Sequence, residues 1–281
     1  MSSTAPTISL EYFPPRTEKG AQGLAAARAE LKLLKPSYVS VTFGAGGSTQ
    51  DGTYATIKSI LEEDGVDAAP HISCISSSRR ELADMLEAYR DLGVKRLVAL
   101  RGDVPSGYGT MDAAELRYAN ELVAFIREQT GDHFRIEVAA YPETHPQARS
   151  AQDDLDNFMR KVDAGANSAI TQYFFNPDAY YAFMDSCSKL GLDIPVIPGI
   201  MPITNYKQLA RFSDTCGAEI PRWIRKRLEG YGDDLASIRE FGFDVVLGLC
   251  EKLLDGGAPG LHFYSMNRTE PTRALWKALD L

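Results

Sequence analysis

The stretch IEVAAYPETHPQARSAQDDLDNFMRKVDAGANSAITQYFF (residues 136–175) decides the fold of this chain. It opens with a short apolar segment, continues with a helix-patterned stretch that ends near Gly165, and closes with a second apolar segment. Glycine favours the left-handed cap that ends many helices. Two strands separated by a helix are predicted to lie parallel, because a parallel pair needs a long crossover connection.

This alternation of strand and helix recurs along the whole chain. Eight short apolar segments are predicted as strands: TISLEYF (7–13), YVSVTFG (38–44), AAPHISCI (68–75), KRLVALRG (95–102), IEVAAYPE (136–143), SAITQYFF (168–175), IPVIPGIM (194–201) and GLHFYSMN (260–267). Helix-patterned stretches lie between them, and eight such units close into a barrel. Residues 1–281 are therefore predicted to form a single α/β domain, a (β/α)8 TIM barrel.

The connection between the last two predicted strands is longer than the others. It contains three helix candidates: TNYKQLARFSDTCG (204–217), EIPRWIRKRLEGYG (219–232) and DDLASIREFGFDVVLGLCEKLLDGG (233–257). A regular barrel unit needs only one helix at this point. One or two extra helices are therefore predicted to be inserted before the last strand.

The charge balance argues against polyanionic partners. The chain has 38 acidic and 30 basic side chains, a net charge of −8, which disfavours a nucleic-acid or anionic membrane surface. The first residues, MSSTAPTIS, lack the basic start and apolar run of a signal peptide, and no segment reaches the roughly 18 apolar residues of a membrane helix. We therefore expect a cytoplasmic protein that binds neither nucleic acid nor membranes.

The four cysteines are Cys74, Cys187, Cys216 and Cys250, and they form no CxxC pair. Their wide spacing indicates neither a zinc site nor a disulfide framework. We expect all four to be reduced and mostly buried, and we expect no metal site.

Polar residues close most of the predicted strands. In a (β/α)8 barrel the active site lies at the carboxyl ends of the strands, so these residues are the candidates for chemistry. They are Glu11, Thr42, His71, Arg101, Gly102, Asp103, Tyr141, Glu143, His145, Gln172, Asn267 and Arg268.

Glu11 is the strongest candidate for a catalytic acid. It lies between Leu10 and Tyr12, and apolar surroundings raise the pKa of a carboxyl group, which can then donate a proton near neutral pH. The alternative is a glutamate paired with a buried base for structural reasons, because ion-pair networks also perturb acids. A lone strand histidine such as His71 is more often a core residue, but its place beside other polar strand ends favours a role in the site.

Two further stretches have the composition of phosphate sites. GAGGST (44–49) is rich in glycine but matches neither GxGxxG nor a P-loop, so a Rossmann dinucleotide site is not indicated. Further on, Asp154, Asn157 and Lys161 are spaced to share one helix face, with Arg160 adjacent. The pattern alone is also typical of a solvated helix face.

Several motifs, taken together and in order, are highly specific. They are LEYFPPRT (10–17), VSVTFGAGGSTQDGT (39–53), AAPHISCI (68–75), VALRGD (98–103), VAAYPETHPQA (138–148), KVDAGANSAITQYFF (161–175), VIPGIMPITNYKQ (196–208) and HFYSMNR (262–268). Through them the chain resembles methylenetetrahydrofolate reductases of the short, bacterial kind. The resemblance implies an FAD enzyme on a (β/α)8 barrel. It would reduce 5,10-methylenetetrahydrofolate to 5-methyltetrahydrofolate with NADH or NADPH, supplying methyl groups for methionine synthesis.

The resemblance also implies residue roles. Glu11 matches the family's proton donor, and Asp103 matches the acid near the N1/O2 edge of the flavin. Thr42 and Gln172 match positions that touch nicotinamide or folate, while Gln208 and Arg268 match folate contacts. The flavin contacts that it implies are Phe43, Ala45, His71, Arg101, Gly102, Asp103, Ala119, Tyr141, His145, Ala148, Asp154, Asn157, Arg160 and Lys161.

The chain departs from the family's pattern in two places. Phe43 stands where many relatives have Tyr, which removes a hydroxyl, and residues 104–119 form a longer stretch than in some relatives, which affects the assignment of Ala119. The long eukaryotic members carry an additional half that binds S-adenosylmethionine, so inhibition by that ligand is not expected here. Family members are often homo-oligomers, and the resemblance implies the same for this chain.

The expected mechanism begins with activation of the methylene carbon, which bridges two nitrogens. Glu11 would deliver a proton toward N10 and open the ring to an N5 iminium cation that accepts hydride. Asp103 would favour that cation electrostatically. Nicotinamide and folate would use one site in turn, which gives ping-pong kinetics.

Two other readings share parts of this pattern. Another flavin barrel, such as a proline-dehydrogenase-like oxidase, would share the fold and FAD; LEYFPPRT and the Asn267 and Arg268 pair argue against it. A binding barrel without turnover would not need Glu11, Asp103 and Gln172 together.

Overall fold

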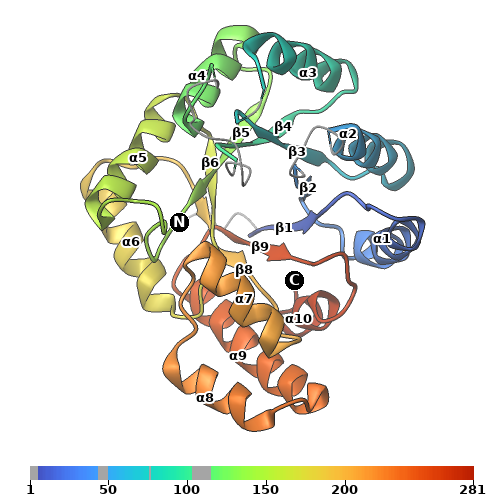
Figure 1. Ribbon diagram of the computed structural model, residues 1–281, viewed down its shortest axis with the longest axis vertical. Helices are drawn as coiled ribbons and strands as arrows, with labels where there is room; N and C mark the ends of the chain where they lie inside the picture. The colour runs from blue at the N-terminus through green and yellow to red at the C-terminus, as the bar shows by residue number, and fades with distance from the viewer. Residues whose placement is uncertain (1–5, 44–49, 76, 103–114) are drawn as a thin grey trace.

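The strands form one closed parallel sheet at the centre of the molecule (Figure 1). The computed structural model describes residues 6–43, 50–75, 77–102 and 115–281. The strands are β1 (Thr7–Tyr12), β2 (Tyr38–Val41), β3 (Ala68–Ser73), β4 (Arg96–Leu100), β5 (Arg135–Ala140), β6 (Ser168–Thr171), β7 (Val196–Ile197), β8 (Gly199–Ile200) and β9 (Gly260–Tyr264). Each predicted segment contains an observed strand, and the predicted (β/α)8 barrel is confirmed.

Helices surround the strands on the outside (Figure 1). They are α1 (Glu18–Leu31), η1 (Lys32–Leu34), α2 (Gln50–Ser59), η3 (Ile60–Asp64), α3 (Arg79–Asp91), α4 (Ala119–Thr130), α5 (Ala151–Asp163), α6 (Pro177–Lys189), α7 (Tyr206–Cys216), α8 (Arg222–Tyr231), α9 (Leu235–Asp255) and α10 (Thr272–Ala278). Because α9 packs between α6 and α10 as a ring helix, α7 and α8 are the inserted pair. This confirms the prediction of extra helices before the last strand.

The seventh predicted strand is divided in two at Pro198. On one side β7 pairs with β6, and on the other β8 pairs with β9, which closes the barrel. Proline has no backbone N–H, so it cannot donate to the ladder at this position. The backbone N–H of Gly199 donates to Oγ1 of Thr171 at 2.9 Å. A side chain at Gly199 would overlap the carbonyl oxygen of Thr171, so only glycine fits this junction.

The barrel wall separates two cores of different character. Along β1, Ile8, Leu10 and Tyr12 face the helices and join the large apolar core between strands and helices. Ser9 and Glu11 alternate with them and face the interior of the barrel. The apolar part of that interior is small, and its buried members are Tyr38, Ala69, Val98 and Ile170.

The cysteines behave as expected from their spacing. All four are free; Cys74, Cys187 and Cys250 are buried, and Cys216 is partly buried. None of the described helices is both long and apolar enough to cross a membrane. In the same described parts of the chain, no group of three or more His, Cys, Asp or Glu side chains is placed to hold a metal ion.

Candidate active site

The carboxylate of Glu11 lies inside the barrel near the carboxyl end of β1, beside two imidazole rings. Its Oε2 atom is 3.4 Å from Nε2 of His71 on β3 and 3.8 Å from Nε2 of His262 on β9. The Glu11 side chain is 19% exposed, whereas both histidines are buried. Burial lowers the pKa of His71 to about 4, and the Glu11 carboxylate opposes this effect only in part. His71 is therefore neutral near pH 7.

The apolar neighbours of Glu11 in sequence are not its neighbours in space. Leu10 and Tyr12 point into the outer core, because successive strand residues face opposite sides of the sheet. The premise that apolar flanking residues surround the carboxylate was therefore wrong. Glu11 remains the candidate acid because it lies at the strand ends, partly exposed and beside the neutral ring of His71.

His262 was missed by the sequence analysis. Its Nδ1 atom is 2.7 Å from Oγ of Ser9, and the two residues are register partners on β9 and β1. The ring thus lies between Ser9 and Glu11. If the Ser9 hydroxyl donates to Nδ1, that nitrogen is the acceptor of the pair, and Nε2 is the ring nitrogen that faces Glu11. The sequence could have indicated His262 only through its pairing with Ser9, which places both side chains on the inner face of the barrel. That pairing is known only once the register of β9 against β1 is known.

The sequence analysis also missed Tyr264, which forms a hydrogen bond at the same end of the barrel as Glu11. Its hydroxyl donates to the backbone carbonyl of Thr171 at 2.7 Å, next to the junction at Gly199. Burial, followed by the charge of Glu11, raises the pKa of Tyr264 well above its usual value. The phenol therefore stays neutral and acts as a hydrogen-bond donor.

The chain after β4 packs tightly on the end of β3. The Ser73 hydroxyl donates to the carbonyl oxygen of Arg101 at 2.9 Å, and the Arg101 guanidinium donates to Oε1 of Gln147 at 2.5 Å. Gly102 has a φ of +86°, and a side chain there would overlap the Ser73 hydroxyl. Glycine is required at this position because the φ is unfavourable for other residues and the backbone passes so close to β3.

The loop after β5 brings several predicted flavin contacts together. The rings of Tyr141 and His145 meet edge to face, with centroids 4.5 Å apart. The backbone N–H of His145 donates to Oδ2 of Asp154 at 2.8 Å, and that of Ala148 donates to the His145 carbonyl at 2.9 Å. Asp154 therefore ties helix α5 to this loop.

Lys161 on α5 carries a buried ammonium. Its Nζ atom donates to the carbonyl of Ala139 in β5 at 2.5 Å and lies 5.5 Å from the centre of the Phe158 ring. Burial lowers the pKa of Lys161 to about 8, and the charge of Asp154 opposes this effect in part. The side chain retains some surface exposure although its Nζ is enclosed. This enclosed ammonium does not fit the reading of a fully solvated helix face.

Asn157 and Arg160, on the same helix, are exposed. The Arg160 guanidinium donates to Oδ1 of Asn157 at 2.7 Å. Helix α5 thus divides the four predicted residues: Asp154 and Lys161 contact the β5 end of the barrel, while Asn157 and Arg160 pair with each other at the surface.

The remaining flavin predictions fall around β2 and α4. Thr42 and Phe43 follow β2 and are partly buried, and the Thr53 hydroxyl donates to the carbonyl of Thr42 at 2.9 Å. Ala119 is the first residue of α4. Ala45 and Asp103 lie outside the described residues.

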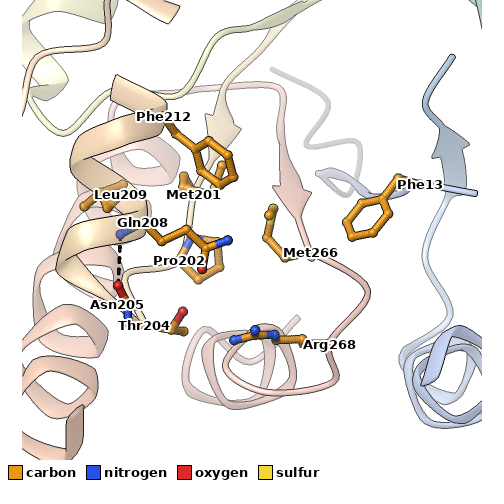
Figure 2. A pocket seen from close by; sticks show the side chains of 10 residues that line it. All are labelled: Phe13, Met201, Pro202, Thr204, Asn205, Gln208, Leu209, Phe212, Met266 and Arg268. Atoms are coloured by element: carbon orange, nitrogen blue, oxygen red, sulfur yellow. Dashed lines mark hydrogen bonds between the residues drawn. The ribbon is translucent and has the colours of Figure 1, made fainter. Parts of the chain in front are cut away.

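A pocket opens between helix α7 and the segment that follows β9 (Figure 2). Gln208 and Arg268, the two predicted folate contacts, both line it, Gln208 from α7 and Arg268 from the segment after β9. The other lining residues are Phe13, Met201, Pro202, Thr204, Asn205, Leu209, Phe212 and Met266. Asn205 caps the start of α7 by accepting from the Gln208 backbone N–H at 2.9 Å. The pocket therefore combines apolar walls with an amide and a guanidinium.

Two sets of hydrogen bonds connect this pocket to Glu11. The Ser265 hydroxyl donates to the carbonyl of Glu11 at 2.6 Å. The side-chain amide of Asn267 accepts from the Phe13 N–H at 3.0 Å and donates to the Phe13 carbonyl at 2.8 Å. The acid and the pocket thus share the same two chain segments.

Gln172 follows β6 and is not among the residues lining that pocket. Its side-chain oxygen accepts from the backbone N–H of Tyr173 at 3.0 Å. Glu143, a polar strand-end candidate, accepts from the backbone N–H of Glu219 at 2.8 Å. That bond fastens the connection between α7 and α8 to the loop after β5.

Comparison of structures supports the fold. An uncharacterised Clostridium thermocellum protein, whose structure is described as binding two copies of 5-methyl-5,6,7,8-tetrahydrofolic acid, matches with a TM-score of 0.68 at 17% identity, over 98% of this chain and 95% of that one. A dihydropteroate synthase from Xanthomonas albilineans matches with a TM-score of 0.53 at 11% identity, over the full length of this chain and 95% of that one.

Comparison of sequences identifies a family, whereas the structural matches identify only the fold. The 5,10-methylenetetrahydrofolate reductases of Salmonella typhimurium and Escherichia coli are each 42% identical over 274 residues, which is 98% of this chain and 90% of each relative. Methylenetetrahydrofolate reductase (NADH) 1 of Zea mays is 35% identical over 92% of this chain and 46% of that protein. The family model for methylenetetrahydrofolate reductase matches residues 1–280. These sequence matches show that the chain belongs to the methylenetetrahydrofolate reductase family.

Proposed function

We propose that this chain reduces 5,10-methylenetetrahydrofolate to 5-methyltetrahydrofolate with hydride from NADH or NADPH, using bound FAD in a ping-pong cycle. The observation that carries the proposal is the position of Glu11: its carboxylate is partly exposed near the end of β1, and its backbone carbonyl accepts from Ser265, on the segment that also carries Arg268 of the pocket. The 42% identity to two bacterial reductases supports the same reaction. By the same resemblance the chain would be a cytoplasmic homo-oligomer whose product serves methionine synthesis.

The pocket suits the two ends of a folate. Phe13, Met201, Phe212 and Met266 offer apolar surfaces to a flat aromatic group. Arg268 offers a guanidinium whose geometry matches a carboxylate, such as that of the glutamate moiety. The Gln208 amide can both donate and accept hydrogen bonds at this site.

Helix α5 carries polar groups that fit a flavin nucleotide. Lys161 and Arg160 supply cations for the diphosphate, and Asp154 and Asn157 supply acceptors for ribose and adenine. Gly102, where the chain after β4 packs against Ser73, is a further proposed contact. The other contacts proposed for FAD are those of Thr42, Phe43, Ala45, His71, Arg101, Asp103, Ala119, Tyr141, His145 and Ala148.

When bound, FAD supplies a carrier that takes hydride from nicotinamide and later gives it to the folate. The protein itself supplies the proton that the reaction needs. Glu11 gives a proton toward N10 of the folate, which opens the five-membered ring to the N5 iminium cation. His71, neutral near pH 7, can accept or donate a hydrogen bond to Glu11 as the acid changes its protonation state. Asp103 and Gln172 complete the proposed site, with Asp103 opposing the positive charge of the cation.

Purified protein provides the test. We expect a yellow protein whose flavin spectrum bleaches on addition of NADH or NADPH and recovers on addition of 5,10-methylenetetrahydrofolate. A flavin that bleaches but does not recover with folate would point to another flavin barrel. A colourless protein that binds 5-methyltetrahydrofolate and remains colourless with added FAD would point to a binding barrel without turnover.

A further inference from the structure

The interior of the barrel below Glu11 contains buried polar atoms that lack hydrogen-bond partners among the described residues. They are the Tyr38 hydroxyl, the Ser40 hydroxyl, Nε2 of His71, Nε of Arg96, Oε2 of Glu137, the Ser168 hydroxyl and Nε2 of His262. Buried polar groups in folded proteins are nearly always hydrogen-bonded, either to protein or to ordered water. This concentration of polar atoms therefore indicates a hydrated interior.

Some of these groups follow one another in a continuous order from Glu11. Nε2 of His262 is 3.8 Å from Glu11, and Nδ1 of His262 is 2.7 Å from the hydroxyl of Ser9. Ser9 is the register partner of Tyr38 on the neighbouring strand, so the two residues lie next to each other in the sheet. The two hydroxyls lack the geometry of a full hydrogen bond, so a small rotation or one bridging water is needed to connect them.

The order continues to the opposite end of the barrel. Tyr38 and Arg96 are the first residues of their strands, and the Arg96 guanidinium lies 4.2 Å from the centre of the Tyr38 ring. Arg96 forms an ion pair with the buried Glu137, and Arg135 lies 3.9 Å from the same carboxylate. The side chains of Arg96 and Arg135 are 21% and 46% exposed. The polar series therefore reaches solvent at the amino end of the barrel.

We propose that this series, running from the Arg96 and Glu137 pair through Tyr38, Ser9 and His262, returns a proton to Glu11 after each folate reduction. The inference rests on the proposed function, in which each turnover takes one proton from Glu11. While flavin and folate are both bound they would cover the carboxyl ends of the strands, and in that part of the cycle the amino end would stay open to solvent through Arg96 and Arg135.

The transfer balances without a further reactant. Tyr38 gives its hydroxyl proton to Ser9, Ser9 gives its own to Nδ1 of His262, and Nε2 of His262 gives its proton to the Glu11 carboxylate. Water at the Arg96 and Glu137 pair replaces the proton on Tyr38, so the net result moves one proton from solvent to Glu11 and leaves the imidazole proton of His262 on Nδ1. Exchange of that proton with water in the hydrated interior returns it to Nε2 before the next turnover. No electron moves. Burial and the charge of Glu137 raise the pKa of Tyr38, which keeps the phenol protonated between transfers.

The test compares first and later turnovers in the FAD-loaded enzyme. Tyr38→Phe and Ser9→Ala each remove one hydroxyl from the series. We expect a pre-reduced variant to complete its first folate reduction within twofold of the wild-type rate, because the incubation before mixing lets Glu11 reach its protonation equilibrium even if the series is slow. Steady-state kcat should fall at least tenfold and should rise with the concentration of a small protonated buffer such as imidazolium.

Tyr89→Phe is the matched control, because Tyr89 is a buried tyrosine on α3 that belongs to the outer core. It should equal the wild type in both phases. A kcat within twofold of wild type in both series variants would overturn the route, and so would an equal loss in first and later turnovers, which would mean that the hydroxyls only shape the site.

An infrared measurement separates the route from the reductase activity. After a downward pH jump in the complex with FAD and 5-methyltetrahydrofolate, the carboxylic C=O band that Glu11→Gln lacks should grow at least tenfold more slowly in Tyr38→Phe than in wild type. Equal rates would overturn the route. If the wild-type enzyme did not reduce 5,10-methylenetetrahydrofolate, the proposed function would be wrong. The infrared rates would still show whether protons reach Glu11 through the series.

Discussion

Nε2 of His71 lies 3.4 Å from Oε2 of Glu11, and burial holds the pKa of this histidine at about 4. In the unfolded chain the same group has a pKa near 6.5. Between these values the unfolded chain binds more protons than the folded chain, so stability must fall as the pH drops through this range. The difference corresponds to at most about 3 kcal/mol.

We therefore predict that His71→Gln makes the free energy of unfolding depend less on pH between pH 6.5 and pH 4. The free energy of unfolding, measured in urea at steps from pH 6.5 to pH 4, should fall less steeply in the variant than in wild type. His133→Gln is the control, because His133 is outside the barrel interior and bonds the Val94 carbonyl; it should keep the wild-type slope. An unchanged slope in His71→Gln would contradict the assigned pKa.

Glu11→Gln separates the two halves of the proposed reaction. The amide keeps the size of the side chain but cannot act as a general acid, and such acids contribute roughly 10²- to 10⁴-fold to a rate. We predict that flavin reduction by NADH stays within about threefold of wild type, whereas reoxidation by 5,10-methylenetetrahydrofolate slows by at least two powers of ten. Stopped-flow absorbance of the flavin measures both. Equal slowing of the two half-reactions would remove Glu11 from the role of proton donor.

The strands and helices could be predicted because each depends on local pattern. Short apolar segments separated by helix-patterned stretches mark the barrel, and every predicted segment contains a strand. The division of the seventh strand at Pro198 could not be predicted in this way. It depends on the pairing of β7 with β6 and of β8 with β9, and these partners are remote in sequence. The single-domain prediction and the assignment of Asp103 stay predictions.

The site was predictable only in part for a related reason. Glu11, Gln208 and Arg268 lie in motifs that can be recognised directly, but His262 and Tyr264 become visible only when the register of β9 against β1 is known. Spacing placed Asp154, Asn157 and Lys161 near one another without showing which of them faces the barrel. Tertiary packing decides that question.

Lys161 and Arg160 on helix α5 are predicted to contribute unequally to FAD binding. Lys161 is enclosed beside the Ala139 carbonyl, whereas Arg160 is exposed. Charge-assisted hydrogen bonds contribute about 1.5–3 kcal/mol, so Lys161→Ala should raise the Kd for FAD roughly 10- to 150-fold. Arg160→Ala should raise it less, because exposed charges are screened by water and salt. Flavin fluorescence during apoenzyme titration gives both constants, and a larger effect at Arg160 would reverse the assignment.

Gly199 provides the last prediction, which concerns the junction that closes the barrel. A side chain there would overlap the Thr171 carbonyl and lie 2.7 Å from the Tyr264 ring. The backbone cannot give way without disturbing the β8 and β9 pairing, so Gly199→Ala should lower the free energy of unfolding by about 1–3 kcal/mol or more. Gly23→Ala is the matched control: Gly23 lies within α1 with nothing near its added Cβ, and alanine there should stabilise the chain by roughly 0.5–1 kcal/mol. Urea denaturation measures both changes. If Gly199→Ala were as stable as wild type, the close approach of β8 to Thr171 would be wrong.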